Sequence, residues 1–181
     1  MTQNYKRYQK KLPTREQKEF GNYMEDNKLY FDVFVTIPLQ STHHNRNVNY
    51  YNSIKRKLTT NIIRSMFKKS ELKKSKNIEM LTIQETNENA FHFKMKVPKC
   101  ERYKDYLTAF FELKSHIRKH CERMKLCSKS FLNSLKFQKE FYKVIYNNKG
   151  LMGYLTKRYS HNLQSIDFYN SKLVLQSNPC I

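Results

Sequence analysis

The sequence predicts an α+β fold, in which helices pack on one antiparallel sheet of about four to five strands. Two patterns predict this class: short segments alternate apolar and polar residues, as strands do, and longer segments repeat apolar residues every three or four positions, as helices do. The composition agrees, because aromatic residues make up 14% of the 181-residue chain, which has only 3 Gly and 4 Pro. Disordered chains are poor in aromatic residues, and this length suits one domain.

The clearest strand is residues 29–37, LYFDVFVTI, and the proline that follows ends it. Its odd-numbered positions are all apolar and are expected to face a core. Its even-numbered positions face the other way, and they are Tyr30, Asp32, Phe34 and Thr36.

The next elements are a helix over residues 48–69 and a hairpin whose strands are residues 78–85 and 91–97. Along the second hairpin strand, inward apolar residues alternate with polar ones on the opposite face, namely His92, Lys94 and Lys96.

The second half of the chain is predicted to contain more helix than strand. A long helix is expected over 102–125, either a strand or a helix over 128–136, a helix over 137–146, a short helix from Gly150, and a last strand near 166–175. Residues 1–27 are polar and basic, and we interpret them as an N-terminal arm with a short helix after Pro13. Residues 28–181 then form a single domain.

The charge of the chain indicates a polyanionic partner. Lys and Arg number 35 and Asp and Glu 15, which gives a formal net charge of +20 at pH 7. Nucleic acid is the natural partner, because lysine and arginine neutralise its phosphates; the alternative is a solvated, lysine-rich surface. We do not expect a membrane as partner, since no apolar run approaches the ~20 residues of a membrane helix and no helix combines a strong apolar face with a uniformly basic one.

The cysteines and histidines do not predict a zinc site. No secretory signal is visible, so we expect an intracellular protein whose four cysteines are thiols. His116 and His120 have a helical spacing that can bind zinc. However, Cys121 points about 100° away from His120 and Cys127 lies beyond the helix end, and so we do not expect structural zinc.

Three motifs follow one another along the chain. The strand VFVTIPLQ comes first, the strand FHFKMKVP with His92 second, and YLTK, in which Lys157 follows Tyr154 by three residues, third. This order resembles the HUH endonucleases, which include the Rep replication initiators of single-stranded DNA viruses, plasmids and phages. Their motifs are an apolar strand, His-hydrophobic-His or His-hydrophobic-Gln, and Tyr-x-x-Lys on a helix. The resemblance covers roughly residues 29–160.

The resemblance implies an RRM-like or ferredoxin-like HUH fold and a metal-dependent endonuclease that nicks and joins single-stranded DNA at an origin or hairpin. Tyr154 would attack the phosphate and form a 5′-phosphotyrosine, while Lys157 on the same helix face would hold the phosphate or help the phenol to lose its proton. Mg²⁺ or Mn²⁺ would polarise the phosphate. The resemblance also suggests a host replicative helicase as a partner, in the bacterial cytoplasm or in the nucleus of a eukaryotic host.

The metal ligands that the resemblance implies are His92 and Glu85, and the expected pairing of the hairpin adds Gln84 as a candidate. Glu85 resembles a carboxylate that Rep proteins often carry just before the hairpin. The sequence departs from the family at Lys94, which stands where the family has a second His or Gln, because an ammonium has no lone pair for a metal. Asp32 is another carboxylate candidate.

The pairing of the hairpin decides which of these groups share a face. If Leu81 pairs with Met95 and Ile83 with Phe93, both strands have consistent faces. Gln84 then lies opposite His92, and Glu85 points to the other face unless a bulge turns it.

A second hypothesis is a non-catalytic domain that binds single-stranded nucleic acid. Lys94 favours this hypothesis, whereas Tyr154 and Lys157 after a hairpin with His92 favour the nuclease. In a binding domain, Tyr154 is a core aromatic residue and His92 an ordinary strand histidine. The expected nucleic-acid contacts are stacking aromatic residues and basic residues, namely Tyr30, Phe34, Lys94, Lys96 and Arg158.

Overall fold

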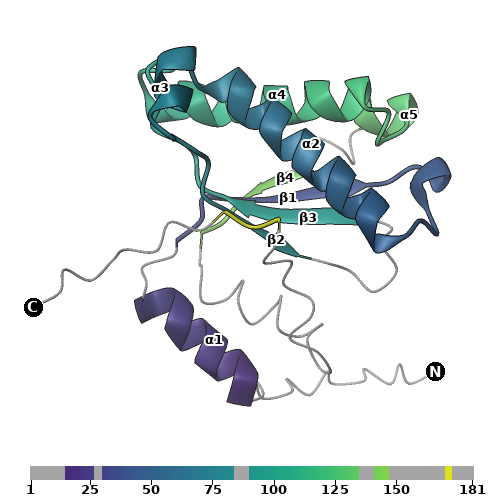
Figure 1. Cartoon of the computed structure of the whole chain (residues 1–181), viewed down its shortest axis with the longest axis horizontal. Coiled ribbons are helices and arrows are strands. Elements are labelled where there is room, and N and C mark those ends of the chain that lie inside the picture. The colour runs from purple at the N-terminus through teal and green to yellow at the C-terminus, as the bar shows by residue number, and fades with distance from the viewer. Residues whose placement is uncertain (1–14, 27–29, 84–89, 135–140, 147–169, 173–181) are drawn as a thin grey trace, which may run out of the picture.

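The computed structural model describes residues 15–26, 30–83, 90–134, 141–146 and 170–172. Within these ranges the strands β1 (Val33–Pro38), β2 (Met80–Ile83), β3 (Ala90–Met95) and β4 (Tyr142–Val144) form one antiparallel sheet in the order β2-β3-β1-β4. Figure 1 shows this sheet with helices packed on it, which confirms the predicted α+β class.

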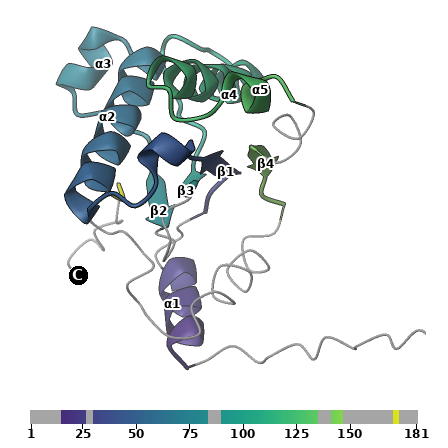
Figure 2. The same ribbon diagram turned by 90° about the vertical axis from the view of Figure 1, so that its right-hand side faces the viewer.

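The helices lie on both sides of the sheet. In the views of Figures 1 and 2, α2 and α4 lie on one side, whereas α1 lies on the other. The main elements follow one another along the chain as β-α-β-β-α-β. The helical segments are α1 (Arg15–Asp26), the 3-10 turn η1 (Ser41–His43), α2 (Val48–Met66), α3 (Lys69–Lys73), α4 (Tyr106–Arg123) and α5 (Lys129–Leu132).

The core lies between the sheet and the two long helices. The inward positions predicted for β1 and β3 are buried, and they pack with apolar residues of α2 and α4. Each strand alternates because successive side chains point to opposite faces. The core residues of these four elements include Val33, Val35, Ile37, Phe91, Phe93, Met95, Leu58, Ile62, Met66, Leu113 and Ile117.

Side-chain caps fix where the two long helices begin. Asn47 accepts a hydrogen bond from the backbone N–H of Tyr50 at 2.9 Å at the start of α2. Asp105 accepts one from the backbone N–H of Thr108 at 2.8 Å at the start of α4. Such caps satisfy N–H groups that have no partner within the helix. The helix predicted over 48–69 ends earlier, at Met66, and α3 follows it.

For the second half of the chain, the structure decides one open prediction and contradicts another. The stretch predicted as strand or helix contains the short helix α5. The helix predicted over 137–146 is wrong, because residues 142–144 form β4, in which Tyr142 lies opposite Val35 and Val144 opposite Val33. Aromatic and β-branched residues favour strands, and pairing with β1 outweighs the helical spacing of the apolar residues.

The free side of β2 meets a segment near the end of the chain. Lys172 and Met80 exchange two backbone hydrogen bonds of 2.8 Å. Thr82 adds a bond from its backbone N–H to Ser171 Oγ at 2.9 Å and one from its hydroxyl to the carbonyl of Asn170 at 3.1 Å. Of the strand predicted near 166–175, only residues 170–172 lie in the described ranges, and there Lys172 forms this bridge.

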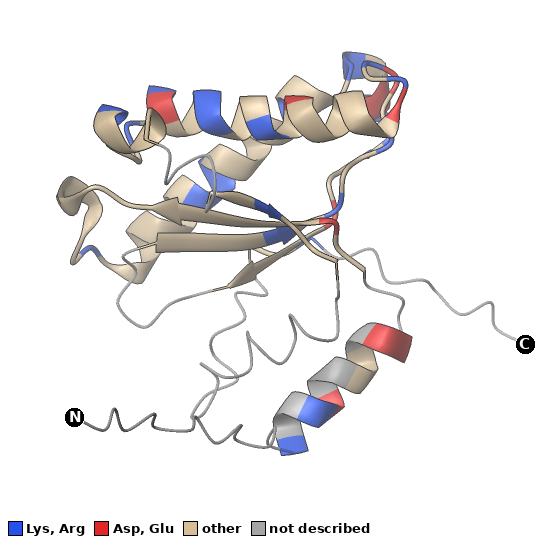
Figure 3. Cartoon of the chain, turned by 180° about the vertical axis from the view of Figure 1, so that it is seen from behind, with Lys and Arg blue, Asp and Glu red and all other residues tan. Residues whose placement is uncertain are grey.

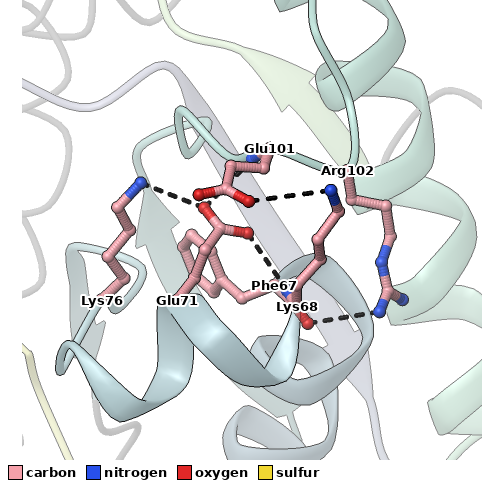
Figure 4. A network of polar contacts seen from close by, with 6 residues as sticks. All are labelled: Phe67, Lys68, Glu71, Lys76, Glu101 and Arg102. Atoms are coloured by element: carbon pink, nitrogen blue, oxygen red, sulfur yellow. Dashed lines mark hydrogen bonds and ion pairs between the residues drawn. The ribbon is translucent and has the colours of Figure 1, made fainter.

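A buried carboxylate joins α3 to the segment before α4 (Figure 4). Glu71 has no exposed surface. It accepts hydrogen bonds from the backbone N–H groups of Lys68 (3.1 Å) and Glu101 (3.0 Å) and from the Lys76 ammonium (3.0 Å). Burial alone would raise the pKa of Glu71, but these hydrogen bonds outweigh it and the pKa is lowered. Arg102 adds a second link by donating to two backbone carbonyls around the end of α2.

Candidate nucleic-acid interface

The face of the sheet turned away from α2 and α4, called the second face below, carries several of the side chains singled out in the sequence. Because side chains alternate along a strand, Phe34 and Thr36 of β1 and His92 and Lys94 of β3 all lie on it. Strand pairing sets them in two neighbouring rows. One row is Leu81, Lys94, Phe34 and Lys143, and the other is Ile83, His92 and Thr36.

The pairing of β2 with β3 differs from the pairing expected from the sequence. Ile83, and not Gln84, lies opposite His92, and Leu81 lies opposite Lys94. The expectation that Leu81 and Ile83 share a face with the inward residues of β3 is therefore wrong, and so is the expectation that Gln84 pairs with His92. Met80 faces the core in their place. All four residues of β2 are buried, so polarity could not fix the pairing, and a slip of one residue exchanges the two faces.

Two contacts with β1 orient the ring of His92. Its Nδ1 lies 3.2 Å from the hydroxyl oxygen of Thr36. The imidazole also stacks on Phe34, with ring centroids 5.6 Å apart and planes 9° apart. The residue is half-buried, and its Nε2 is not exposed to solvent. A hydrogen bond that fixes one ring nitrogen is what metal-binding histidines commonly have.

Lys94 is buried, with 1% of its surface exposed. The sequence made it a candidate phosphate contact, but its side chain is not at the surface of the folded chain. Burial lowers the pKa of Lys94 to about 7, so the ammonium and the neutral amine are both populated at neutral pH. Its neighbour in the row, Leu81, has no exposed surface either. This part of the second face is therefore covered, which strand alternation alone could not reveal.

Lys143 of β4 lies opposite Phe34 on the side away from Lys94, and it is exposed. Sequence reasoning missed this lysine because it assigned residues 137–146 to a helix. The alternation of bulky and polar residues in Tyr142–Val144 is the signal that could have indicated a strand.

The other candidate residues that the structure describes lie near the start of β1 and the end of β3. Tyr30 is 53% exposed just before β1. The ammonium of Lys96 forms an ion pair with Glu79 at 3.3 Å. Asp32 accepts a hydrogen bond from the backbone N–H of Val97 at 2.7 Å. The residue opposite His92 is Thr36, which follows Asp32 by four residues. Four residues span about 13 Å along a strand, so the sheet does not bring Asp32 and His92 together.

The other predicted site residues lie outside the described residues. They are the nucleophile and the lysine after it, Tyr154 and Lys157; the ligand candidates Gln84 and Glu85; and the basic residue Arg158.

The histidines of α4 take part in contacts that hold the helix in place. His116 Nε2 lies 2.8 Å from the hydroxyl of Tyr103, and His120 Nε2 lies 2.8 Å from the hydroxyl of Ser65 on α2. Cys121 is buried, and this burial raises the pKa of its thiol. In the part of the chain that the structure describes, no group of three or more His, Cys, Asp or Glu residues could hold a metal ion.

Basic residues are distributed over the molecule. Figure 3 shows Lys and Arg on the helices and on the strands, with fewer Asp and Glu among them. None of the described helices is long and apolar enough to cross a membrane. No protein-family model, curated protein or solved structure matches the chain.

Proposed function

We propose that the chain nicks and joins single-stranded DNA, as the motif order suggests, with Tyr154 as the nucleophile and His92 as a ligand of a divalent ion. The observation that carries the proposal is the place of His92: it lies on a central strand of a four-stranded antiparallel sheet, with its ring oriented by Thr36 and Phe34. The sheet order is compatible with the RRM-like or ferredoxin-like HUH fold, which is part of the same proposal. The net charge of +20 supports a polyanionic substrate.

The proposed step is an in-line displacement at phosphorus. The phenol of Tyr154 loses its proton, and its oxygen forms a bond to the scissile phosphate. The bond from phosphorus to the 3′ oxygen breaks, and this oxygen takes up a proton to become a free 3′-OH. The products are a 5′-phosphotyrosine and a 3′-OH, and the reverse step joins the strand. Lys157, three residues after Tyr154 in the sequence, would offset the negative charge that develops on the phosphate.

The described residues fit a divalent ion only in part. With Nδ1 of His92 directed at Thr36, Nε2 would be the coordinating atom. Further oxygen donors would have to come from Gln84 and Glu85, which suit Mg²⁺ or Mn²⁺ better than zinc. When bound, such an ion polarises the phosphate.

One observation favours a second candidate function, a non-catalytic domain that binds single-stranded nucleic acid. Lys94 occupies the position of a second metal ligand, and it is buried beside the row that contains His92. A protonated lysine there would oppose a bound cation. In this alternative the basic surface and the Phe34 ring bind the strand, and no bond is broken.

The test is incubation with a pool of single-stranded oligonucleotides and Mn²⁺, followed by a denaturing gel. The nuclease gives a protein band that carries covalent DNA. Tyr154→Phe keeps the ring and removes the attacking oxygen, so it should give no such band, while the control Tyr159→Phe should still give it. A wild-type protein that binds DNA but never becomes covalently attached would contradict the nuclease and support the binding domain. A protein that does not bind at low salt would contradict both.

A further inference from the structure

Exposed aromatic and apolar side chains surround β4 and the start of α4. We call this group the edge surface; it consists of Tyr30, Tyr106, Phe111, Val144 and Tyr146, which are between 42% and 93% exposed. Tyr146 is the most exposed large apolar residue among the described ones. Apolar residues gathered on a surface in this way indicate an interaction site.

Ring contacts join the α4 part of this surface to β4. The ring of Phe110 lies between three others: its centroid is 6.3 Å from that of Tyr106, 5.4 Å from that of Phe111 and 5.1 Å from that of Tyr142 on β4. The hydroxyl of Tyr142 also donates to the carbonyl of Phe110 at 3.1 Å. The exposed rings of Tyr106 and Phe111 therefore pack against Phe110, which in turn packs against Tyr142.

Backbone pairing places Tyr146 and Tyr30 at the same end of the β1–β4 pair. The N–H of Ile145 donates to the carbonyl of Asp32 at 2.8 Å. Antiparallel pairing with the β1 segment thus continues past the end of β4 and sets Tyr146 alongside residues 30–31. Val144, opposite Val33, links this end of the surface to the rest.

Exposed lysines lie on or next to the elements that carry these rings. Lys143 lies within β4 itself, and Lys104 lies just before α4. Aromatic faces that accept bases, next to cations that neutralise phosphates, are the two elements of single-strand binding. A second copy of the chain is a poor occupant, because β4 has only three residues and carries a lysine, and the net charge of +20 makes two copies repel each other.

We propose that the edge surface binds single-stranded DNA by stacking bases on Tyr106, Phe111 and Tyr146. Lys143 lies both on the second face beside Phe34 and on the edge strand, so one DNA strand could pass from the second face onto the edge surface. This inference rests on the single-stranded DNA substrate of the proposed function but does not depend on cleavage.

The test is a binding titration with fluorescent oligothymidylate and the variant Phe111→Ala/Tyr146→Ala. Both side chains are exposed, so the variant should fold and melt like the wild type. Its Kd should rise at least about fivefold for each lost ring. Its Kd for a duplex of the same length should not change, because paired bases are not free to stack. Phe111→Tyr/Tyr146→Phe keeps both rings and should bind like the wild type, as should Val48→Ala, which removes exposed apolar surface at the start of α2.

Three outcomes would count against the inference, and they are distinguishable. Wild-type protein that does not bind oligothymidylate at low salt would overturn the proposed function together with this inference. Wild-type binding that the double alanine variant retains in full would overturn this inference alone. A wild type that sediments as a dimer and a double variant that sediments as a monomer would show that a second copy covers the edge surface.

Discussion

Lys94 and Lys143 lie on opposite sides of Phe34 in one row across the sheet, yet Lys94 is buried and Lys143 is exposed. The two side chains have the same chemistry and nearly the same place, and they differ in access to solvent. Only the exposed one can meet a phosphate without a rearrangement of the sheet. Substituting the two lysines one at a time therefore distinguishes the effect of an exposed charge, which can contact DNA, from the effect of a buried charge, which cannot.

The first prediction concerns the salt dependence of binding. Lys143→Ala should reduce the slope of log Kd against log salt for single-stranded DNA by about 0.7, the value for one lost phosphate contact. Lys94→Met is the control and should leave the slope unchanged. Fluorescence anisotropy over a series of salt concentrations measures both slopes. A slope that responds to Lys94→Met and not to Lys143→Ala would mean that DNA binding opens the covered part of the second face.

The second prediction concerns stability above neutral pH. Burial lowers the pKa of Lys94 from 10.5 to about 7. Between these values the unfolded chain holds a proton on this group that the folded chain has lost, so the free energy of unfolding rises with pH, by at most about 1.4 kcal/mol per pH unit. Below pH ~7 both states are protonated and the penalty for the buried charge is complete.

Lys94→Met should remove this rise, because methionine does not titrate. The difference between wild type and variant, measured by urea unfolding with a chelator present, should favour the variant near neutral pH and shrink as the pH rises. A difference that is constant with pH would contradict the burial of a titrating amine.

The third prediction concerns Glu71, because hydrogen bonds lower the pKa of its carboxyl group below the usual value of 4.5. A lowered carboxyl pKa contributes stability that is present above the unfolded value and is lost as the pH falls through the folded one. Glu71→Gln places an amide where two backbone N–H groups and Lys76 require an acceptor. The variant should lose about 1–3 kcal/mol of unfolding free energy at neutral pH, and the loss should diminish in acid.

Thermal unfolding at neutral and acid pH measures this effect. Glu122→Gln, on the exposed side of α4, is the matched control and should change the stability by less than about 0.5 kcal/mol. Equal effects of the two substitutions would show that the contacts of Glu71 do not stabilise α3.

The sequence predicted the parts of the fold in which one pattern had no competitor. Val33, Val35 and Ile37 alternate with polar or half-buried residues, and they are buried as expected. The spacing of Leu58 and Ile62 likewise predicted the buried side of α2. In these segments the local pattern and the tertiary packing agree, so the local pattern was enough.

The hydrophobic pattern did not predict the structure where both faces of a segment are buried, or where the spacing of apolar residues fits both a strand and a helix. β2 is buried throughout, so its pairing, and with it the partner of His92, depends on contacts that are distant in sequence. Residues 142–144 have bulky residues at spacings that suit either element, and pairing with β1 decides for a strand. The burial of Lys94 could not be predicted either, because an alternating strand does not reveal whether its second face is covered.

The last prediction concerns His92 and separates its place in the fold from its proposed chemistry. His92→Phe keeps an aromatic ring that can stack on Phe34 and removes both ring nitrogens. The cost is the contact with the Thr36 hydroxyl, about 1 kcal/mol of unfolding free energy, so the variant should fold and still bind single-stranded DNA.

If His92 helps to hold a divalent ion, His92→Phe should form no covalent adduct with DNA in Mn²⁺, whereas the wild type does. Thr36→Val is the control: it removes the hydrogen bond at 3.2 Å but keeps the imidazole. It should still form the adduct, more slowly and with a higher Mn²⁺ requirement, because the ring is less well oriented. An adduct formed by His92→Phe at the wild-type rate would remove His92 from the proposed site and leave it as a residue that packs on Phe34.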